Sequence, residues 1–508
     1  MLAAREGVMR RLAIGVAILA GAVLGASALW PERLALNAPI LRPMLGLETD
    51  PPPPSELQQR VRVPEGFSIA VYAAGLENAR FLRFSAAGDL LVSQPRLGRI
   101  TLLERDAGGD GLPDGRRVLL EDLNRPHGLD LHDGWLYVAE TDAVGRIRFD
   151  AASRSVSGGF ERVVTGLPGG GTHWTRTLRF GPDGWLYVSV GSSCNACLED
   201  DPRRASLLRF RSDGSGFEIY ASGLRNMVGF DWRPGTDELY GTDNGRDFLG
   251  NDFPPCELNR IERGAFYGWP YANGNKVPDP DHGAGHAGKI RESLAPAHGF
   301  GAHTAPLGMT FLRGPHWPPA YRGAALVALH GSWNRTEKQG YEVVSLHWGG
   351  RGTVRERPFA TGFELDEDVI GRPVDVAEGP DGAVYISDDY AGSIYRVVYG
   401  EASPGAALAP DAGARAPIDP LAGLGPAERE ARVARGRELW DRYFCAQCHE
   451  GLRAQEGVIV VPLQRLSERY AVEDLVRFLR APTPPMPALD LSDDERRDLS
   501  VYLLAAHP

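Results

Sequence analysis

The sequence lacks a surplus of positive charge. Its 55 lysine and arginine residues are outnumbered by 66 aspartates and glutamates, which gives a net charge of -11 over 508 residues. This balance argues against nucleic acid and against an anionic membrane surface as partners. A chain of this length is expected to form two or more domains.

Cysteine is scarce, with five residues in the whole chain. Cys194 and Cys197 form a C-x-x-C pair that is followed by Leu198. We expect a short-loop disulfide there, and the alternative is two buried free thiols. Cys256 is left over. So few cysteines exclude a scaffold held together mainly by disulfides.

The other two cysteines belong to a C-x-x-C-H motif. It consists of Cys445, Cys448 and the adjacent His449. Two thiols at this spacing can form thioethers to one haem, and the histidine can bind its iron as the proximal ligand. The alternatives are a thiol redox pair and half of a zinc site. The motif therefore predicts haem c and electron transfer.

Methionine is almost as scarce, with six residues, and one of them stands between prolines. Met486 follows Pro485 and precedes Pro487, so we expect it to be the second axial ligand of the haem iron; the alternative is a core-filling side chain. Ser492 and Glu495 predict a capping box. Three helices are expected around the motif, at 427–444, 472–479 and 492–504. The segment 421–508 resembles a small all-α class I cytochrome c domain.

The N-terminus carries an apolar run, Leu12–Trp30, after Arg10 and Arg11. Ala26-Ser27-Ala28 offers a cleavage site, so the run is either a signal peptide or a retained membrane anchor. Because c-type haem is attached on the periplasmic side of the membrane, we expect an exported, periplasmic protein. The expected division of the chain is 1–30 (signal or anchor), 31–63 (proline-rich linker), 64–400 (propeller), 401–420 (Ala/Pro linker) and 421–508 (cytochrome).

One pattern recurs between about Pro64 and Gly400: an Asp-Gly turn followed by an apolar strand. The clear copies are 133–139, 183–189 and 381–387, and the weaker ones are 88–93, 237–241 and 325–329. Asp-Gly favours a type I′ hairpin turn, and the repeat spacing is that of propeller blades. We expect an all-β, six-bladed β-propeller; the alternative is seven blades. Residues 267–303 are expected to form a long loop insertion near the mouth.

Polar residues precede or follow most copies, in loops that should converge on one end of the central channel. At least four arginines and several histidines gather there in an otherwise acidic chain. Guanidinium groups bind carboxylates in bidentate fashion. The pattern predicts a site for an anionic ligand with several carboxylates.

Three stretches carry a resemblance to a known family. They are Leu224-Arg225-Asn226, His173 ahead of Gly181-Pro182-Asp183-Gly184, and Phe266-Tyr267-Gly268-Trp269-Pro270. They resemble the pyrroloquinoline quinone (PQQ)-dependent sugar dehydrogenases, which include soluble glucose dehydrogenase. The run His330 to Arg335 points to the sorbosone and pyranose dehydrogenase branch. The resemblance covers 64–400 and implies that PQQ, a planar tricarboxylate quinone, binds at the mouth.

The resemblance also implies roles for single residues. His173 matches the general base that takes the hydroxyl proton from C1 of the sugar. Arg225, with Asn226 beside it, matches the residue that polarises the quinone oxygen, and Arg372 matches one that holds a PQQ carboxylate. The family's second arginine is replaced by Val374, and its lysine on the fifth blade has no match. The further candidates for PQQ binding are Arg96, Arg125, His127, His330 and Arg335.

A calcium ion over the quinone is implied as well. Its oxygen ligands are expected in the loop 243–257, where Cys256 is an unsuitable neighbour because a thiolate is a poor calcium ligand. The expected ligands are Asp243, Asn244, Asp247, Asp252 and Glu257.

Together these features predict a periplasmic dehydrogenase that oxidises a sugar or related aldehyde at C1 by hydride transfer to PQQ. Electrons would pass to the fused haem and then to a periplasmic or membrane acceptor. The alternatives are a non-catalytic binding propeller that carries a cytochrome and a metal-dependent, lactonase-like propeller. Neither needs several cations at one mouth, so the arginines disfavour both.

Overall fold

The computed structural model describes residues 56, 59–400, 420–421, 423–443, 445–449, 463, 466, 470–480, 489 and 491–507. The expected signal or anchor segment and Met486 lie outside these residues, as does nearly all of the second linker. The chain separates into two compact units, one that contains 59–400 and one that contains 420–507, and each is described by itself.

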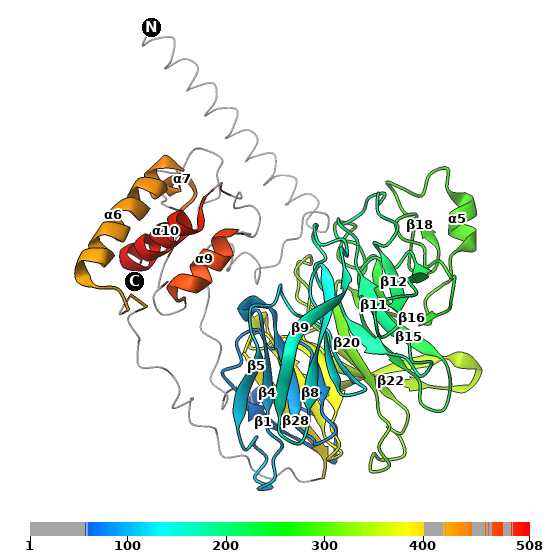
Figure 1. The fold of residues 1–508 in the computed structure, drawn as a ribbon. Helices are drawn as coiled ribbons and strands as arrows, with labels where there is room; N and C mark the ends of the chain where they lie inside the picture. The colour runs from blue at the N-terminus through cyan, green and yellow to red at the C-terminus, as the bar shows by residue number, and fades with distance from the viewer. Residues whose placement is uncertain are drawn as a thin grey trace. The chain divides into compact units, whose positions relative to one another are not determined.

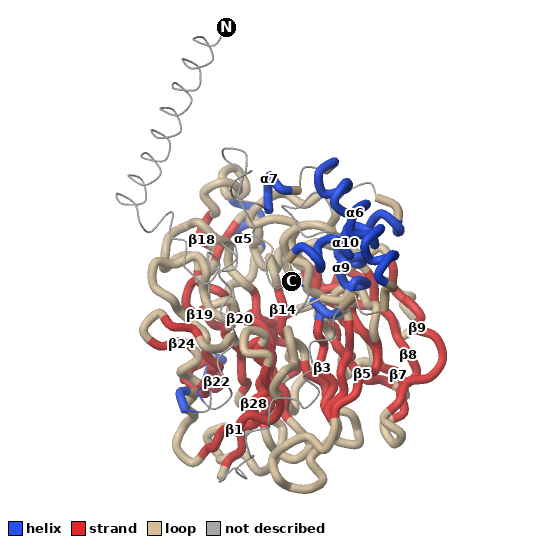
Figure 2. The backbone as a smooth tube through the Cα atoms, turned by 90° about the vertical axis from the view of Figure 1, so that its left-hand side faces the viewer, coloured by secondary structure: helices blue, strands red, loops and turns tan. Residues whose placement is uncertain are grey.

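The first unit is a propeller of six four-stranded antiparallel sheets (Figures 1 and 2). Blade one comprises β2 (Leu82–Phe84), β3 (Leu90–Gln94), β4 (Arg99–Leu103) and β5 (Arg116–Leu120). Blade two comprises β6 (Leu129–His132), β7 (Trp135–Ala139), β8 (Ala143–Asp150) and β9 (Ser155–Thr165). Blade three comprises β10 (Leu178–Phe180), β11 (Leu186–Val190), β12 (Ser206–Phe210) and β13 (Glu218–Ser222).

The remaining three blades include one strand from the start of the propeller. Blade four comprises β14 (Met227–Trp232), β15 (Leu239–Asp243), β16 (Pro255–Ile261) and β19 (His298–Ala302). Blade five comprises β20 (Pro306–Phe311), β21 (Ala325–Leu329), β22 (Glu342–Trp348) and β23 (Val354–Ala360). Blade six comprises β26 (Pro373–Glu378), β27 (Val384–Asp388), β28 (Ser393–Tyr399) and β1 (Phe67–Ala73). The prediction of six blades rather than seven is confirmed.

The ring closes because β1 pairs with β28 in blade six, from Phe67↔Tyr399 to Ala73↔Ile394. The segment ahead of β1 pairs elsewhere: Arg62 bridges Thr361, in the loop that joins blades five and six. The two ends of the propeller chain therefore lie at opposite ends of the channel. Residues 59–62 lie beside the loops that enter the inner strands, whereas Gly400, whose N–H donates to Gly66 (2.8 Å), follows β28 at the far end.

The repeated Asp-Gly turns have two geometries. Asp133 and Gly134 both have positive φ (50° and 75°) and join His132 directly to Trp135, which is the expected type I′ hairpin. At Asp183 the prediction of a two-residue turn is wrong. Phe180 pairs with Leu186, only Gly184 has positive φ, and the Asp183 carboxylate accepts from the Tyr187 hydroxyl at 2.9 Å.

The apolar strand that follows each turn, the second strand of its blade, is buried on both faces. β3, β11, β15, β21 and β27 are buried along their whole length. Apolar side chains of neighbouring blades pack together; Leu90 and Val92 of blade one, for example, share a cluster with Tyr385 of blade six. Burial between blades, rather than within one sheet, holds the propeller together.

The insertion in blade four is only partly a loop. It carries β17 (Ala272–Asn273), β18 (Val277–Pro278) and α5 (Ala287–Glu292), and its last residues form the outer strand β19. Arg246 anchors it through Asp279 (2.7 and 2.8 Å) and Asp281 (2.8 Å). Smaller elements of the propeller are η1 (Pro95–Leu97), η2 (Gly350–Gly352), β24 (Glu364–Leu365) and β25 (Asp368–Val369).

The second unit is helical. It contains α6 (Pro426–Arg442), α7 (Ala446–His449), α9 (Val472–Arg480) and α10 (Asp493–Ala506), so the three predicted helices are present. The capping box of Ser492 and Glu495 is confirmed. Asp498 of α10 binds Arg432 (2.8 Å) and Arg435 (2.6 Å) of α6. Among the helices that the structure describes, none is long and apolar enough to cross a membrane.

Candidate active site

Most of the predicted site residues lie on two classes of loop, which open at the same end of the channel. Loops of one class lead from the outer strand of one blade into the inner strand of the next. Those of the other class join the second and third strands of a blade. In an up-and-down blade both classes share one end, which we call the mouth. The first class carries Arg125, His127, His173, Arg225, Asn226 and Arg372, and the second carries Arg96, Asn244, Asp247, Asp252, His330 and Arg335.

The floor of the mouth is apolar. Phe81, Val228, Leu307 and Val374 form one buried cluster, and each stands at or just before the start of an inner strand. Val374, where the resemblance led us to expect an arginine, contributes to this floor. Such a floor suits the face of a planar ring.

Above the floor, Arg80, Arg96, Arg125 and Arg372 converge, and we call them the arginine group. Burial and the charges of Arg80 and Arg96 lower the pKa of Arg125 to about 10. Burial and the charges of Arg372 and Arg96 likewise lower the pKa of Arg80. Within the described part of the chain, Asp389 is the one carboxylate that forms an ion pair with a member of the group, through Arg80 at 2.5 Å.

An aromatic wall adjoins the arginine group. The Arg125 guanidinium lies over the Trp174 ring at 3.9 Å, and that of Arg80 lies 5.7 Å from it. His127 is buried, packs on Phe81 with 4.2 Å between ring centroids, and its Nε2 has no hydrogen-bond partner among the described residues. A buried unpaired nitrogen of this kind is typical of a ligand-binding position.

Sequence reasoning missed Arg80 and Asp389. Arg80 precedes the inner strand of blade one as Arg125 precedes that of blade two, so the repeat register could have found it. Asp389 also binds His330 Nε2 at 2.9 Å. Burial and Arg372 lower the pKa of His330 to about 4, which keeps it neutral, and Arg372 Nε donates to the His330 carbonyl at 3.2 Å.

His173 stands on the other side of the mouth, on the loop into blade three. Its Nδ1 lies 2.9 Å from the Ser192 carbonyl oxygen and 2.9 Å from Ser192 Oγ. A carbonyl oxygen can only accept, so Nδ1 carries the proton and Nε2 is the basic nitrogen. Burial and the nearby Arg225 lower the pKa of His173 to about 3, so the ring is neutral at physiological pH.

Arg225 is buried and fully bonded to the protein. Nε donates to the Asn195 carbonyl (2.8 Å), Nη1 to those of Asn244 (3.2 Å) and Gly245 (2.9 Å), and Nη2 to Asn195 Oδ1 (2.8 Å) and Asp247 (3.1 Å). A guanidinium has five N–H donors, so none is left for a ligand in this arrangement. In this arrangement, the expected role of Arg225 in polarising the quinone oxygen would depend on its positive charge and not on a hydrogen bond to the ligand.

Asn226 is the better polar contact on this side. A Cβ on Gly191 would lie 2.6 Å from His173 Cβ and 2.7 Å from Asn226 Oδ1, so these two side chains meet at a glycine. Asn226 Oδ1 is buried and has no hydrogen-bond partner in the described part of the chain. Asn226 Oδ1 can therefore accept a hydrogen bond from a ligand that lies beside His173.

The expected calcium ligands fall in separate places. Asp243, Asn244 and Glu257 line one cavity of about 20 Å³, the size of a single water or ion. Burial raises the pKa of Asp243 to about 7 and that of Glu257 to about 8. Asp247 instead pairs with Arg225 at 3.1 Å, and the exposed Asp252 pairs with Arg335 at 3.0 Å.

These ion pairs also set Arg335 apart from the arginine group, because its guanidinium is held by Asn251 and Asp252. Cys256 is a buried thiol that packs with Phe300 and Tyr240 in the core of blade four. The predicted Cys194–Cys197 disulfide is confirmed.

The haem motif lies at the start of α7 in the second unit. The His449 N–H donates to the Cys445 carbonyl at 3.0 Å, which places these residues one helical turn apart. The His449 ring lies 5.8 Å from that of Trp440. The side chain of Cys448 and the whole of Met486 fall outside the described part of the chain.

Comparison with known proteins gives a consistent picture. An uncharacterised protein of Borreliella burgdorferi is 28% identical over 370 residues, which cover 68% of this chain and 92% of that protein. The pyrroloquinoline quinone-dependent pyranose dehydrogenase of Coprinopsis cinerea is 25% identical over 406 residues, which cover 66% of this chain and 54% of the enzyme. This chain thus matches about half of that enzyme's length.

The fold agrees with that of the same enzyme. The holo form of the PQQ domain of Coprinopsis cinerea pyranose dehydrogenase superimposes with a TM-score of 0.58 at 23% identity, over 66% of this chain and 97% of the domain. The TrAA12-like family matches residues 61–257 and 287–400. The unmatched stretch, 258–286, includes much of the insertion in blade four. Since the match covers more than half of the chain, this protein belongs to the TrAA12-like family.

Proposed function

We propose that the propeller is a PQQ-dependent oxidoreductase that oxidises a sugar or related aldehyde at C1. The single observation that carries this proposal is the arginine group: four guanidinium groups above an apolar floor, bound by one carboxylate within the described chain. Such a surplus of positive charge requires an anion. The Coprinopsis cinerea relative, whose name includes PQQ and pyranose, supports PQQ as that anion.

The residues present fit the cofactor. Its three carboxylates would be bound by Arg80, Arg96, Arg125 and Arg372, because guanidinium groups pair with carboxylates in bidentate fashion. Its flat ring would lie on the apolar floor beside Trp174. His127 Nε2 and Asn226 Oδ1 are buried and have no hydrogen-bond partner among the described residues, so each could bind a polar atom of the ligand.

When bound, PQQ supplies a quinone that accepts a hydride from the substrate. The chain supplies the base: His173 Nε2 accepts the C1 hydroxyl proton, while Nδ1–H stays on the Ser192 carbonyl. Arg225 contributes a positive charge near the developing anion without donating a hydrogen bond to it. Asn226 orients the bound ligand beside His173.

Calcium is part of the proposal, with Asp243, Asn244 and Glu257 as its protein ligands. All three residues line one small cavity, which Arg225 also lines, and they carry oxygen atoms, the ligands that hard cations prefer. As a Lewis acid the ion would stabilise negative charge at the mouth. Asp247 and Asp252 are excluded from this ligand set, because arginines already bind them.

We further propose that the second unit carries haem c, held by Cys445, Cys448, His449 and Met486, and passes electrons to a periplasmic or membrane acceptor. The C-x-x-C-H motif supports this proposal.

The test uses the purified full chain with its haem. PQQ and calcium are added, then a panel of aldoses, ketoses and aldehydes, and haem reduction is followed by absorbance. The proposal expects reduction that depends on both PQQ and substrate. Hydrolysis of lactones without haem reduction would favour a lactonase-like propeller, and failure of the folded protein to bind PQQ would favour a binding propeller. Either result would overturn the proposal.

A further inference from the structure

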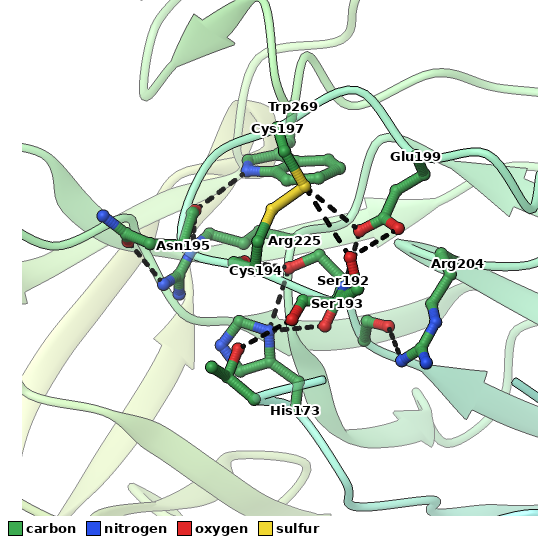
Figure 3. Close-up of a disulfide and its surroundings, with 12 residues drawn as sticks. His173, Ser192, Ser193, Cys194, Asn195, Cys197, Glu199, Arg204, Arg225 and Trp269 are labelled. Atoms are coloured by element: carbon green, nitrogen blue, oxygen red, sulfur yellow. Dashed lines mark hydrogen bonds between the residues drawn. A yellow bond between two sulfur atoms is a disulfide. The ribbon is translucent and has the colours of Figure 1, made fainter. Parts of the chain in front are cut away.

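The Cys194–Cys197 disulfide lies in a loop that contacts both Arg225, through Asn195, and His173, through Ser192 (Figure 3). It closes a short ring inside the loop that joins β11 to β12. Both sulfurs belong to half-buried residues, and the neighbouring Leu198 is 60% exposed. A disulfide that closes so few residues constrains the unfolded chain less than one that closes a long loop. Its effect is therefore expected to be local.

One side of the ring holds Arg225. Asn195, which lies between the two cysteines, accepts from Arg225 through its carbonyl (2.8 Å) and its Oδ1 (2.8 Å). The same side chain exchanges two hydrogen bonds with the backbone of Asp247, at 2.8 and 3.1 Å. Trp269 of the insertion donates to the Asn195 carbonyl at 3.4 Å. The ring thus ties blade three to the Arg225 loop, the Asp247 loop and the insertion.

The other side of the ring holds His173. The Cys194 carbonyl accepts from Ser192 Oγ at 2.7 Å. That bond orients the Ser192 hydroxyl, whose oxygen, with the Ser192 carbonyl, faces His173 Nδ1. The Cys194 backbone therefore helps to fix the Ser192 hydroxyl, which is one of the two acceptors at His173 Nδ1.

A second contact keeps the ring in place. Glu199 accepts from Ser193 N (2.5 Å) and from Ser193 Oγ (2.8 Å), so the chain on both flanks of the disulfide is bound together. The Ser193 carbonyl accepts from Thr172 N at 2.9 Å, next to His173. Without the cross-link, this irregular loop would gain conformational freedom.

We propose that the Cys194–Cys197 disulfide is a positioning element of the active site, which fixes His173 and Arg225 through the backbone of its ring. The proposal rests on the proposed function for its catalytic consequence alone. Opening the ring should disturb the His173 side of the mouth and leave the arginine group in place. Misplacement of a catalytic group by about 1 Å can lower the rate roughly 100-fold.

The first test replaces both cysteines, C194S/C197S, in the full chain with its haem. We expect kcat to fall about 10- to 100-fold and PQQ affinity to change by less than about threefold, because the arginine group is intact. The acid limb of the pH–rate profile reports protonation of His173. It should shift to higher pH, toward the ordinary histidine pKa of about 6.5, because His173 loses its fixed surroundings. A merely structural disulfide would not move that limb. The matched control is Leu198→Ser, an exposed change beside the ring, which should leave all three quantities unchanged.

The second test needs no cofactor and no turnover, so it remains valid if the proposed function fails or the variant does not fold. The apo wild-type protein is treated with a dithiol, which reduces the disulfide to two thiols and is itself oxidised to a cyclic disulfide; its two protons pass to the cysteine sulfurs. Amide hydrogen exchange should accelerate at 192–195, 225–226 and 243–247, and not at 78–96 or 372–389.

Unchanged exchange at 225–226 after complete reduction would overturn the proposal, as would equal acceleration throughout the propeller. A C194S/C197S variant with wild-type kcat and pH profile would do the same.

Discussion

The two sides of the propeller mouth both present arginines on their loops, but the surroundings of these arginines differ. On the blade-three and blade-four side, every N–H group of Arg225 is bound by a protein oxygen. On the opposite side, Arg96 and Arg125 have no side-chain hydrogen bond to any residue that the structure describes, and Arg80 shares Asp389 with His330. The first arrangement positions groups, and the second leaves charge available for a ligand.

This difference shows that residue type and loop position do not define a role by themselves. Arg225 and Arg125 both precede inner strands. They differ in the acceptors that surround them, which come from distant parts of the sequence. Four predictions test this difference between the two sides of the mouth, from the largest expected effect to the smallest.

The largest effect is expected from His173→Ala. Loss of a positioned general base lowers turnover by about 10²- to 10⁴-fold, while PQQ affinity should stay within about threefold because the arginine group is unchanged. Haem reduction kinetics and a PQQ titration by tryptophan fluorescence measure the two quantities. His132→Ala, at the far end of an inner strand, is the control. Normal turnover in His173→Ala would show that His173 is not the general base.

Arg225→Ala should cost mainly stability. It removes the arginine partner of Asp247 and the donor to the Asn244 and Gly245 carbonyls, and loss of a buried charged partner costs about 3 kcal/mol or more. The Tm of the apo protein should fall by several degrees. Arg96→Ala, which removes no side-chain hydrogen bond within the described chain, should leave Tm nearly unchanged. Equal Tm values for Arg225→Ala and Arg96→Ala would show that the two arginines do not differ in their contribution to stability.

The arginine group should control PQQ affinity. Arg96→Ala, Arg125→Ala and Arg372→Ala are each expected to weaken binding about 10- to 100-fold, since a charge-assisted hydrogen bond contributes about 1.5–3 kcal/mol. Equilibrium dialysis of PQQ measures this directly. Arg335→Ala is the matched control, because Asp252 and Asn251 already bind that guanidinium. If Arg335→Ala were the most damaging variant, the assignment of the group would be wrong.

The smallest effect concerns pH. The pKa values of His173 and His330 are lowered to about 3 and about 4 by burial and a nearby arginine, whereas in the unfolded chain both lie near about 6.5. Between these values the unfolded chain binds more protons, so stability falls as the pH falls below about 6.5. Each histidine contributes at most about 1.4 kcal/mol per pH unit.

That contribution can be isolated by measuring Tm at pH 7 and pH 5.5. His173→Ala and His330→Ala should each lose less Tm than the wild type over this interval. An identical loss in all three proteins would show that neither imidazole is held neutral by its surroundings.

Much of the fold could be predicted because the repeat is a local signal. Asp183-Gly184 and Asp381-Gly382 each recur with a tyrosine at a fixed distance, and the structure shows why: the tyrosine hydroxyl binds the aspartate of its own turn. The outer strand β19 was hidden inside the insertion, since its pairing with β16 joins residues far apart in sequence.

The candidate site was predictable to the level of loops and no further. The positions of His173, Arg225 and Arg372 relative to the repeated strands predicted that all three lie at one end of the channel. It could not show that Arg225 is fully bonded or that Asp247 and Asp252 bind arginines, because these contacts depend on side-chain geometry between blades. The repeat signal of blade one, 88–93, is weak, so it does not mark Arg80, which precedes the inner strand of that blade.

The chain enters the propeller at the mouth end, where Arg62 bridges Thr361, and leaves it at Gly400 on the far end. This asymmetry matters for anyone who fixes the protein to an electrode or a bead. A linkage ahead of residue 59 would hold the opening against the support and hinder diffusion of sugar into it. A linkage introduced after Gly400 would turn the opening toward the solution.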